Sequence, residues 1–208
     1  GITAGTPDPP GGVIVKDPRT GEPTGVLKES ARALMAAVVP QPTREDRVRA
    51  IRKAVAEANR LGVTSVHEAG TDAETLEQFE DVQKAGDLSV RVYAALAVTE
   101  AMTDADADAF GALRAKYASN PRIKVGAIKI MDDGVIEAHT AAMLAPYSNT
   151  PTPGKANYEP AELQRIVTLM DARGWQVMTH AIGDGAVRMT LDAYEKAARA
   201  NPEPPRGR

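Results

Sequence analysis

The chain has 208 residues, of which 43% are hydrophobic and 25% charged, with a formal net charge of −3 and no cysteine. This is the composition of a globular protein with one sizeable core. It argues against a nucleic-acid or membrane-surface partner, and it excludes disulfides and thiolate metal sites. No apolar run approaches the roughly 20 residues that span a bilayer, and no signal-peptide pattern opens the chain, so we expect a cytoplasmic protein.

Residues 1–42 are rich in turn-forming residues. Short β-prone runs on either side of the segment 17–21 predict two strands around a turn, followed by a short helix over 29–38. We expect this segment to form a hairpin-like appendage, with a separate domain over residues 43–208.

Helices and strands are predicted to alternate from residue 43 onward. Thr43 and Thr103 are expected to cap helices, Pro160 suits the first turn of another, and glycines follow several apolar helical stripes. The expected elements are helices over 43–61, 73–85, 103–117, 160–173 and 184–201, strands over 63–68, 89–96, 125–131 and 175–182, and a long loop over 134–157.

Strict alternation predicts parallel strands joined by right-handed helical crossovers. No glycine-rich dinucleotide or phosphate fingerprint follows a strand, which disfavours an open doubly wound sheet. The sequence therefore predicts an α/β fold that is a partial (β/α)8 barrel of about four strand–helix units. A closed barrel does not fit in this chain.

Lys129 stands in the middle of an apolar strand. Alternation places it on one face with Val125, Ala127 and Met131, and places isoleucines on the other face. A protonated lysine inside a barrel costs several kcal/mol unless it is paired or neutralised. Three explanations remain open on the residues alone: an ion pair with a nearby aspartate, a Schiff-base lysine of depressed pKa, or a carbamate formed with carbon dioxide that binds metal ions.

Barrel enzymes carry their active sites at the carboxyl ends of the strands. In addition to Lys129, the candidate residues at those ends are His67, Glu68, Asp132, Asp133, His180 and Asp184. Structural roles compete for each: the aspartates 132 and 133 can make the turn before Gly134, and Asp184 can cap the last helix.

Six segments taken together resemble the amidohydrolase superfamily. They are KIMDDG (129–134), TAAMLAPYS (140–148), GWQVMTHAIGD (174–184), TPDPPGG (6–12), TGVLKE (24–29) and LGVTSV (61–66). The resemblance covers nearly the whole chain and is closest to the family-3 branch that includes N-substituted formamide deformylases.

The resemblance implies a (β/α)8 barrel that holds one or two divalent metals, usually zinc. It also implies that Lys129 is the carboxylated lysine ligand of the fourth strand and that His180 is the fifth-strand histidine, so that this chain supplies strands 2 to 5. The implied activity is hydrolysis of carbon–nitrogen bonds other than peptide bonds in a small amide-like substrate.

Three ligand positions of that family have no counterpart here. The histidines are His67, His139 and His180, so there is no His-x-His pair, and neither a sixth-strand histidine nor an eighth-strand aspartate is found. We therefore expect an internal fragment of a longer enzyme that is inactive alone. The alternatives are a Schiff-base lyase that uses Lys129 with Asp133 as proton relay, or a non-catalytic barrel remnant that acts by assembly, for example as a homo-oligomer.

Overall fold

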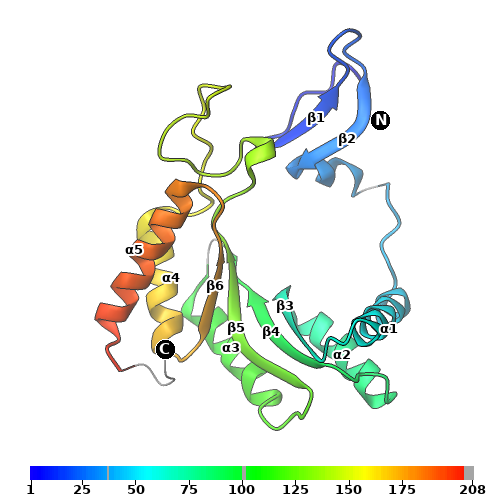
Figure 1. Cartoon of the computed structure of the whole chain (residues 1–208), viewed down its shortest axis with the longest axis vertical. Coiled ribbons are helices and arrows are strands. Elements are labelled where there is room, and N and C mark those ends of the chain that lie inside the picture. The colour runs from blue at the N-terminus through cyan, green and yellow to red at the C-terminus, as the bar shows by residue number, and fades with distance from the viewer. Residues whose placement is uncertain (37, 100–101, 204–208) are drawn as a thin grey trace. The chain divides into compact units, whose positions relative to one another are not determined.

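A computed structural model describes residues 1–36, 38–99 and 102–203 (Figure 1). The chain divides into two compact units. The hairpin unit comprises Gly1–Gln41, Asp133–Ala156 and Ala181–Val187, and the sheet unit comprises Pro42–Asp132, Asn157–His180 and the described residues from Arg188 onward.

The hairpin unit is built on two antiparallel strands, β1 (Gly12–Lys16) and β2 (Pro23–Glu29). The Lys16 ammonium donates to the carbonyls of Ala4 and Thr6, at 2.7 and 2.8 Å, and so fastens the preceding segment to the hairpin. The predicted hairpin is confirmed. The helix predicted over 29–38 is a 3-10 helix, η1 (Ser30–Met35), and residue 37 lies outside the described residues.

The sheet unit contains four parallel strands: β3 (Ser65–Thr71), β4 (Arg91–Ala97), β5 (Ile123–Met131) and β6 (Gln176–His180). Their order in the sheet is β3-β4-β5-β6, the same as in the chain. A doubly wound sheet reverses its strand order at a switch point, whereas a (β/α)8 barrel adds its strands consecutively. The fold is thus part of a (β/α)8 barrel, as the sequence predicted.

Five α-helices accompany the strands of this part of the chain: α1 (Arg44–Arg60), α2 (Ala73–Lys84), α3 (Asp104–Lys116), α4 (Pro160–Ala172) and α5 (Asp184–Ala200). Thr43 and Thr103 each form a capping box with the aspartate three residues later, as the sequence indicated for both helix starts. Asp72 caps α2 by accepting from the Thr75 amide. None of the helices in the described residues combines the length and apolarity needed to cross a membrane.

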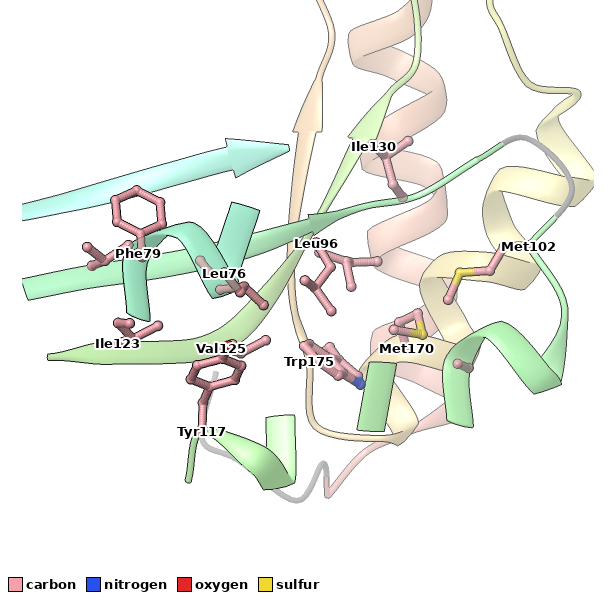
Figure 2. Close-up of a cluster of buried hydrophobic side chains, with 14 of the residues drawn as sticks. Leu76, Phe79, Leu96, Met102, Tyr117, Ile123, Val125, Ile130, Met170 and Trp175 are labelled. Atoms are coloured by element: carbon pink, nitrogen blue, oxygen red, sulfur yellow. The ribbon is translucent and has the colours of Figure 1, made fainter. Parts of the chain in front are cut away.

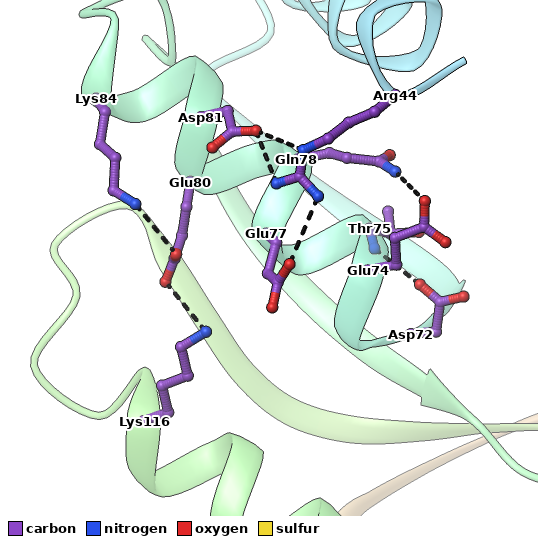
Figure 3. Close-up of polar contacts among 10 residues, drawn as sticks. All are labelled: Arg44, Asp72, Glu74, Thr75, Glu77, Gln78, Glu80, Asp81, Lys84 and Lys116. Atoms are coloured by element: carbon purple, nitrogen blue, oxygen red, sulfur yellow. Dashed lines mark hydrogen bonds and ion pairs between the residues drawn. The ribbon is translucent and has the colours of Figure 1, made fainter. Parts of the chain in front are cut away.

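Exposed ion pairs link neighbouring helices of the sheet unit (Figure 3). The Arg44 guanidinium of α1 contacts Asp81 and Glu77 of α2, at 2.8 and 3.5 Å. Glu80 of α2 lies between Lys84 and Lys116. Since all these groups keep solvent access, each pair adds at most about 1 kcal/mol.

The core lies between one face of the sheet and the helices (Figure 2). Val92, Leu96, Ile128 and Ile130 point from the strands into this cluster, and Trp175, fully buried, closes it at the start of β6. The helices contribute the rest, including Leu76, Phe79, Val82, Leu163, Ile166 and Met170. The opposite face of the sheet is called the inner face below, since it would line the interior of a barrel.

A bulge in β5 changes which residues face the core. The register with β4 shifts between Ala94, which pairs with Val125, and Ala95, which pairs with Ala127. Val125 therefore packs in the same core cluster as Ile128 and Ile130. The prediction that Val125 shares a face with Lys129 is wrong, because strict alternation does not allow for the extra residue of a bulge.

Gly126 makes this bulge compatible with the neighbouring strand. A Cβ atom at residue 126 would lie 2.5 Å from the Tyr93 hydroxyl and 2.8 Å from the adjoining ring carbon. The ring of Tyr93 thus lies over a position that has no side chain.

Replacing Gly126 by alanine is expected to lower the free energy of unfolding by about 1–3 kcal/mol, because the methyl group forces the Tyr93 ring away. Urea unfolding of Gly126→Ala, Tyr93→Ala and the double variant measures the coupling between the two residues. The double variant should lose less stability than the sum of the single variants; strict additivity would contradict this packing.

Candidate active site

Lys129 lies on the inner face of the sheet. Its strand neighbours Ile128 and Ile130 are both fully buried in the core, and Lys129 pairs with Ala97 of β4 and Met178 of β6. Gly70 of β3 also leaves space beside it, since a Cβ atom at Gly70 would be 4.0 Å from the Lys129 Cγ. The lysine is half-buried among apolar or small neighbours.

Across residues 1–36, 38–99 and 102–203 the structure gives the Lys129 ammonium neither a hydrogen bond nor an ion pair. Burial lowers the pKa of this amine below its ordinary value of 10.5, because desolvation penalises the charged form. The ion-pair explanation for Lys129 therefore loses its support in these residues.

His180 lies on the same face at the end of the neighbouring strand. It pairs with Met131, two residues beyond Lys129, and its carbonyl accepts from the Asp132 amide at 3.0 Å. Parallel pairing with a period of two puts Lys129, Met178 and His180 together on the inner face, at the carboxyl ends of β5 and β6. This is the end of the strands that carries the active site in barrel enzymes.

His67 and Glu68 occupy different surroundings from Lys129. His67 is on the inner face but pairs with Tyr93, which in turn pairs with Lys124, nearer the amino end of β5. Glu68 lines an apolar groove against α1 together with Ile51, Val55, Phe79 and others. Burial raises the pKa of the Glu68 carboxyl there.

Asp133 organises the loop of the hairpin unit. One of its carboxylate oxygens accepts from the amides of Ala142 and Gly183, at 2.9 and 2.8 Å, and the other from the amide of Ile182, at 2.9 Å. Asp184 accepts from the Leu144 amide at 2.8 Å. Both carboxylates thus fasten the loop 134–157 to the turn that precedes α5.

Gly183 is required by the same arrangement, since a Cβ atom there would be 2.0 Å from the Ala142 carbonyl oxygen. In the motif HAIGD (180–184), the histidine faces the candidate site while the Gly-Asp pair holds the loop. Asp132, in the sheet unit, is fully buried and accepts from the Thr190 hydroxyl at 3.3 Å.

His139 was not among the predicted site residues and lies in the hairpin unit. Its ring nitrogen Nε2 is 3.1 Å from the Asn149 amide oxygen, and its ring meets Tyr147 edge-on. Its backbone is left-handed, with φ of 55°. Residue spacing predicts neither the left-handed backbone of His139 nor its contacts with Asn149 and Tyr147.

Two predicted metal ligands, Lys129 and His180, share one face and one end of adjacent strands. No group of three or more histidine, cysteine, aspartate or glutamate side chains in the described residues is arranged to hold a metal ion. A tightly held metal needs at least three protein ligands. Lys129 and His180 could therefore provide only two of the three or more ligands that such a metal centre needs.

A consecutive parallel sheet with polar residues at its carboxyl ends is the arrangement of a (β/α)8-barrel enzyme. A family model described as "Amidohydrolase family" matches residues 1–208. The chain belongs to the amidohydrolase family.

Individual relatives agree with this assignment. The chain is 33% identical over 202 residues to YtcJ of Bacillus subtilis, provisionally named an amidohydrolase, and 31% identical over 208 residues to LONG AFTER FAR-RED 3 of Arabidopsis thaliana. These matches cover 94% and 97% of this chain and 36% of each relative. The chain thus spans about a third of the length of these relatives.

A solved structure is also similar. It is an uncharacterized metal-dependent hydrolase from Pyrococcus horikoshii, with a TM-score of 0.66 and 28% identity, and the match covers 89% of this chain and 38% of that one.

Replacing Asp133 by asparagine is expected to lower the free energy of unfolding by about 1–3 kcal/mol, because the amide side chain offers one acceptor oxygen where the carboxylate offers two charged ones. Hydrogen exchange should quicken at the amides of Ala142, Ile182 and Gly183. The matched control is Glu137→Gln in the same loop, where the carboxyl is exposed. Unchanged exchange in Asp133→Asn would contradict the role given to this carboxylate.

Replacing Lys129 by methionine should stabilise the metal-free protein, by up to about 1 kcal/mol, because a half-buried charge is removed while its apolar stem is kept. The folded-state pKa of this amine is depressed. Burying the charged amine therefore lowers the free energy of unfolding by its full amount at pH values below that pKa. The penalty then shrinks as pH rises toward the unfolded value of 10.5.

Thermal unfolding of Lys129→Met and of the parent from pH 7 to pH 10.5 tests whether the substitution stabilises the protein and whether this gain shrinks as the pH rises. Lys53→Met, at an exposed lysine of α1, is the matched control and should change little. A variant less stable than the parent at pH 7 would show that the ammonium has a stabilising partner.

Proposed function

We propose that this chain is the central part of a metal-dependent hydrolase that cleaves carbon–nitrogen bonds other than peptide bonds, in the branch of N-substituted formamide deformylases. The observation that carries the proposal is the shared placement of Lys129 and His180 on the inner face, at the carboxyl ends of adjacent strands. Family membership and the similarity to a metal-dependent hydrolase support it.

Lys129 would serve as a carbamate. Its lowered pKa raises the share of neutral amine, whose nitrogen lone pair attacks carbon dioxide. A nitrogen–carbon bond forms, the amine releases one proton, and the product is an anion on a side chain that began as a cation. The small neighbours Ala97 and Gly70 leave room for the added carboxylate.

Lys129 and His180 would hold one or two divalent ions, with zinc as the expected metal. A metal bound there would supply Lewis-acid chemistry at the scissile carbonyl and to the attacking water. The further ligands would come from parts of the longer protein, in keeping with the longer relatives. The chain's own contribution would be a carbamate oxygen and an imidazole nitrogen, presented from adjacent strands.

The remaining predicted residues take supporting roles in this proposal. Asp133 and Asp184 hold the loop 134–157, whose side chains we expect to help select a small amide-like substrate. Asp132 is buried next to Thr190, which suits a positioning role behind the site.

The test measures metal content and formamide hydrolysis of the full-length holoenzyme. Lys129→Ala and His180→Asn should each lower the metal bound per chain at least tenfold and the turnover by about a thousandfold or more, since a ligand is lost. His139→Asn is the control for metal content, because asparagine tolerates the left-handed backbone at that position. Full metal content in both site variants would refute the proposal.

A Schiff-base lyase is the competing use of the same amine. Borohydride reduction in the presence of a carbonyl substrate would attach that substrate covalently to Lys129 in a lyase, whereas a carbamate gives no reduced adduct. The proton relay considered for Asp133 loses support, since both of its carboxylate oxygens are engaged by backbone amides of the loop.

A further inference from the structure

A second pocket lies on the inner face at the amino ends of β3, β4 and β5, the end of the strands opposite to that of Lys129 and His180. Its cavity measures about 330 Å³. The lining residues are Ser65, Val66, His67, Arg91, Val92, Tyr93, Asn120, Pro121, Arg122 and Lys124. Three of these side chains are cationic, one is a histidine and none is acidic.

The two arginines are held by neutral acceptors. Arg91 donates to the hydroxyls of Ser65 and Thr64, at 2.9 and 3.2 Å, and Arg122 donates to the Ser89 carbonyl at 2.9 Å. Within residues 1–36, 38–99 and 102–203, neither guanidinium forms an ion pair. Both groups are therefore oriented before any ligand binds, and their charge is not compensated by a carboxylate.

Aromatic rings complete the wall of the pocket. The Lys124 ammonium lies 5.8 Å from the centre of the Tyr93 ring, and the His67 ring lies 5.0 Å from the same ring. Gly126 allows the Tyr93 ring to lie across β5, as described above. The cations and the rings thus come from three adjacent strands and from the segment that precedes β5.

We propose that this pocket binds a small multivalent anion of the phosphate type. Arginine presents parallel N–H groups that match phosphate oxygens, and lysine adds a point charge. Guanidinium groups already held by hydrogen bonds lose little conformational entropy on binding, which favours an anion in this pocket. The site is separate from the proposed metal centre and does not depend on it.

Isothermal titration of the purified protein with inorganic phosphate at low ionic strength tests the proposal. The parent should bind one phosphate per chain, with an affinity that falls as sodium chloride is added. Lys124→Gln and Arg91→Gln should each weaken binding about tenfold or more, as expected for a lost charge-assisted hydrogen bond.

The matched controls are Lys53→Gln and Arg32→Gln. Lys53 is exposed on α1, and Arg32 donates to the Glu29 carbonyl much as Arg122 donates to Ser89. Both controls should bind phosphate like the parent. Lys124→Gln removes no hydrogen bond that the structure gives, so it keeps the test decisive if Arg91→Gln fails to fold.

Phenyl phosphate separates two sources of the anion. If phenyl phosphate binds more tightly than inorganic phosphate, and Tyr93→Leu removes this difference, the site is assigned to the phosphate ester of an aromatic compound. If the two ligands bind equally, the site is assigned to the free ion. The proposal is overturned if the parent binds no phosphate at millimolar concentration, or if the control variants weaken binding as much as Lys124→Gln does.

Discussion

Placing an amine among apolar neighbours raises the free energy of the folded state unless the charge is lost or compensated. Lys129 is in this position, between Ala97 and Met178 and near Gly70, and no carboxylate of the described residues pairs with it. Carboxylation resolves this conflict only if a metal ion neutralises the resulting anion. In the function proposed above, His180, on the same face of the next strand, would be a second ligand for that ion.

Two carboxylates hold the loop of the hairpin unit in place. Asp133 accepts from the backbone amides of Ala142, Ile182 and Gly183, and Asp184 accepts from the Leu144 amide. These hydrogen bonds fix the loop 134–157 against the turn at residues 181–184. The glycine of that turn is needed because the Ala142 carbonyl occupies the place of a side chain. The short motif HAIGD (180–184) thus contains both a candidate site residue and the residues that position a loop.

Much of the fold could be predicted from the sequence. Helix caps at Thr43 and Thr103 and the alternation of elements gave the helices, the parallel strands and the barrel-type sheet. The bulge at Gly126 was missed because strict alternation was assumed along the whole strand, although a glycine inside a strand often marks a bulge. This single irregularity moved Val125 into the core.

The candidate site was predictable where strand alternation fixed a face, as for Lys129 and His180. It was not predictable where tertiary contacts decide. The side chain of Glu68 lies in a groove against α1. Asp133 accepts hydrogen bonds from amides up to 50 residues away in the chain. Residue spacing in the sequence predicts neither contact. The basic pocket around Arg91 and Lys124 was not predictable for the same reason, since its residues come from three strands and the segment before β5.

The most direct test of this account is a carbon-13 NMR spectrum of the full-length protein prepared with zinc and carbon-13-labelled bicarbonate. We predict a carbamate resonance that is present in the parent, absent in Lys129→Arg, and lost when the metal is removed by chelation. A parent spectrum without this resonance, at full metal content, would contradict the assignment of Lys129 as an anionic metal ligand.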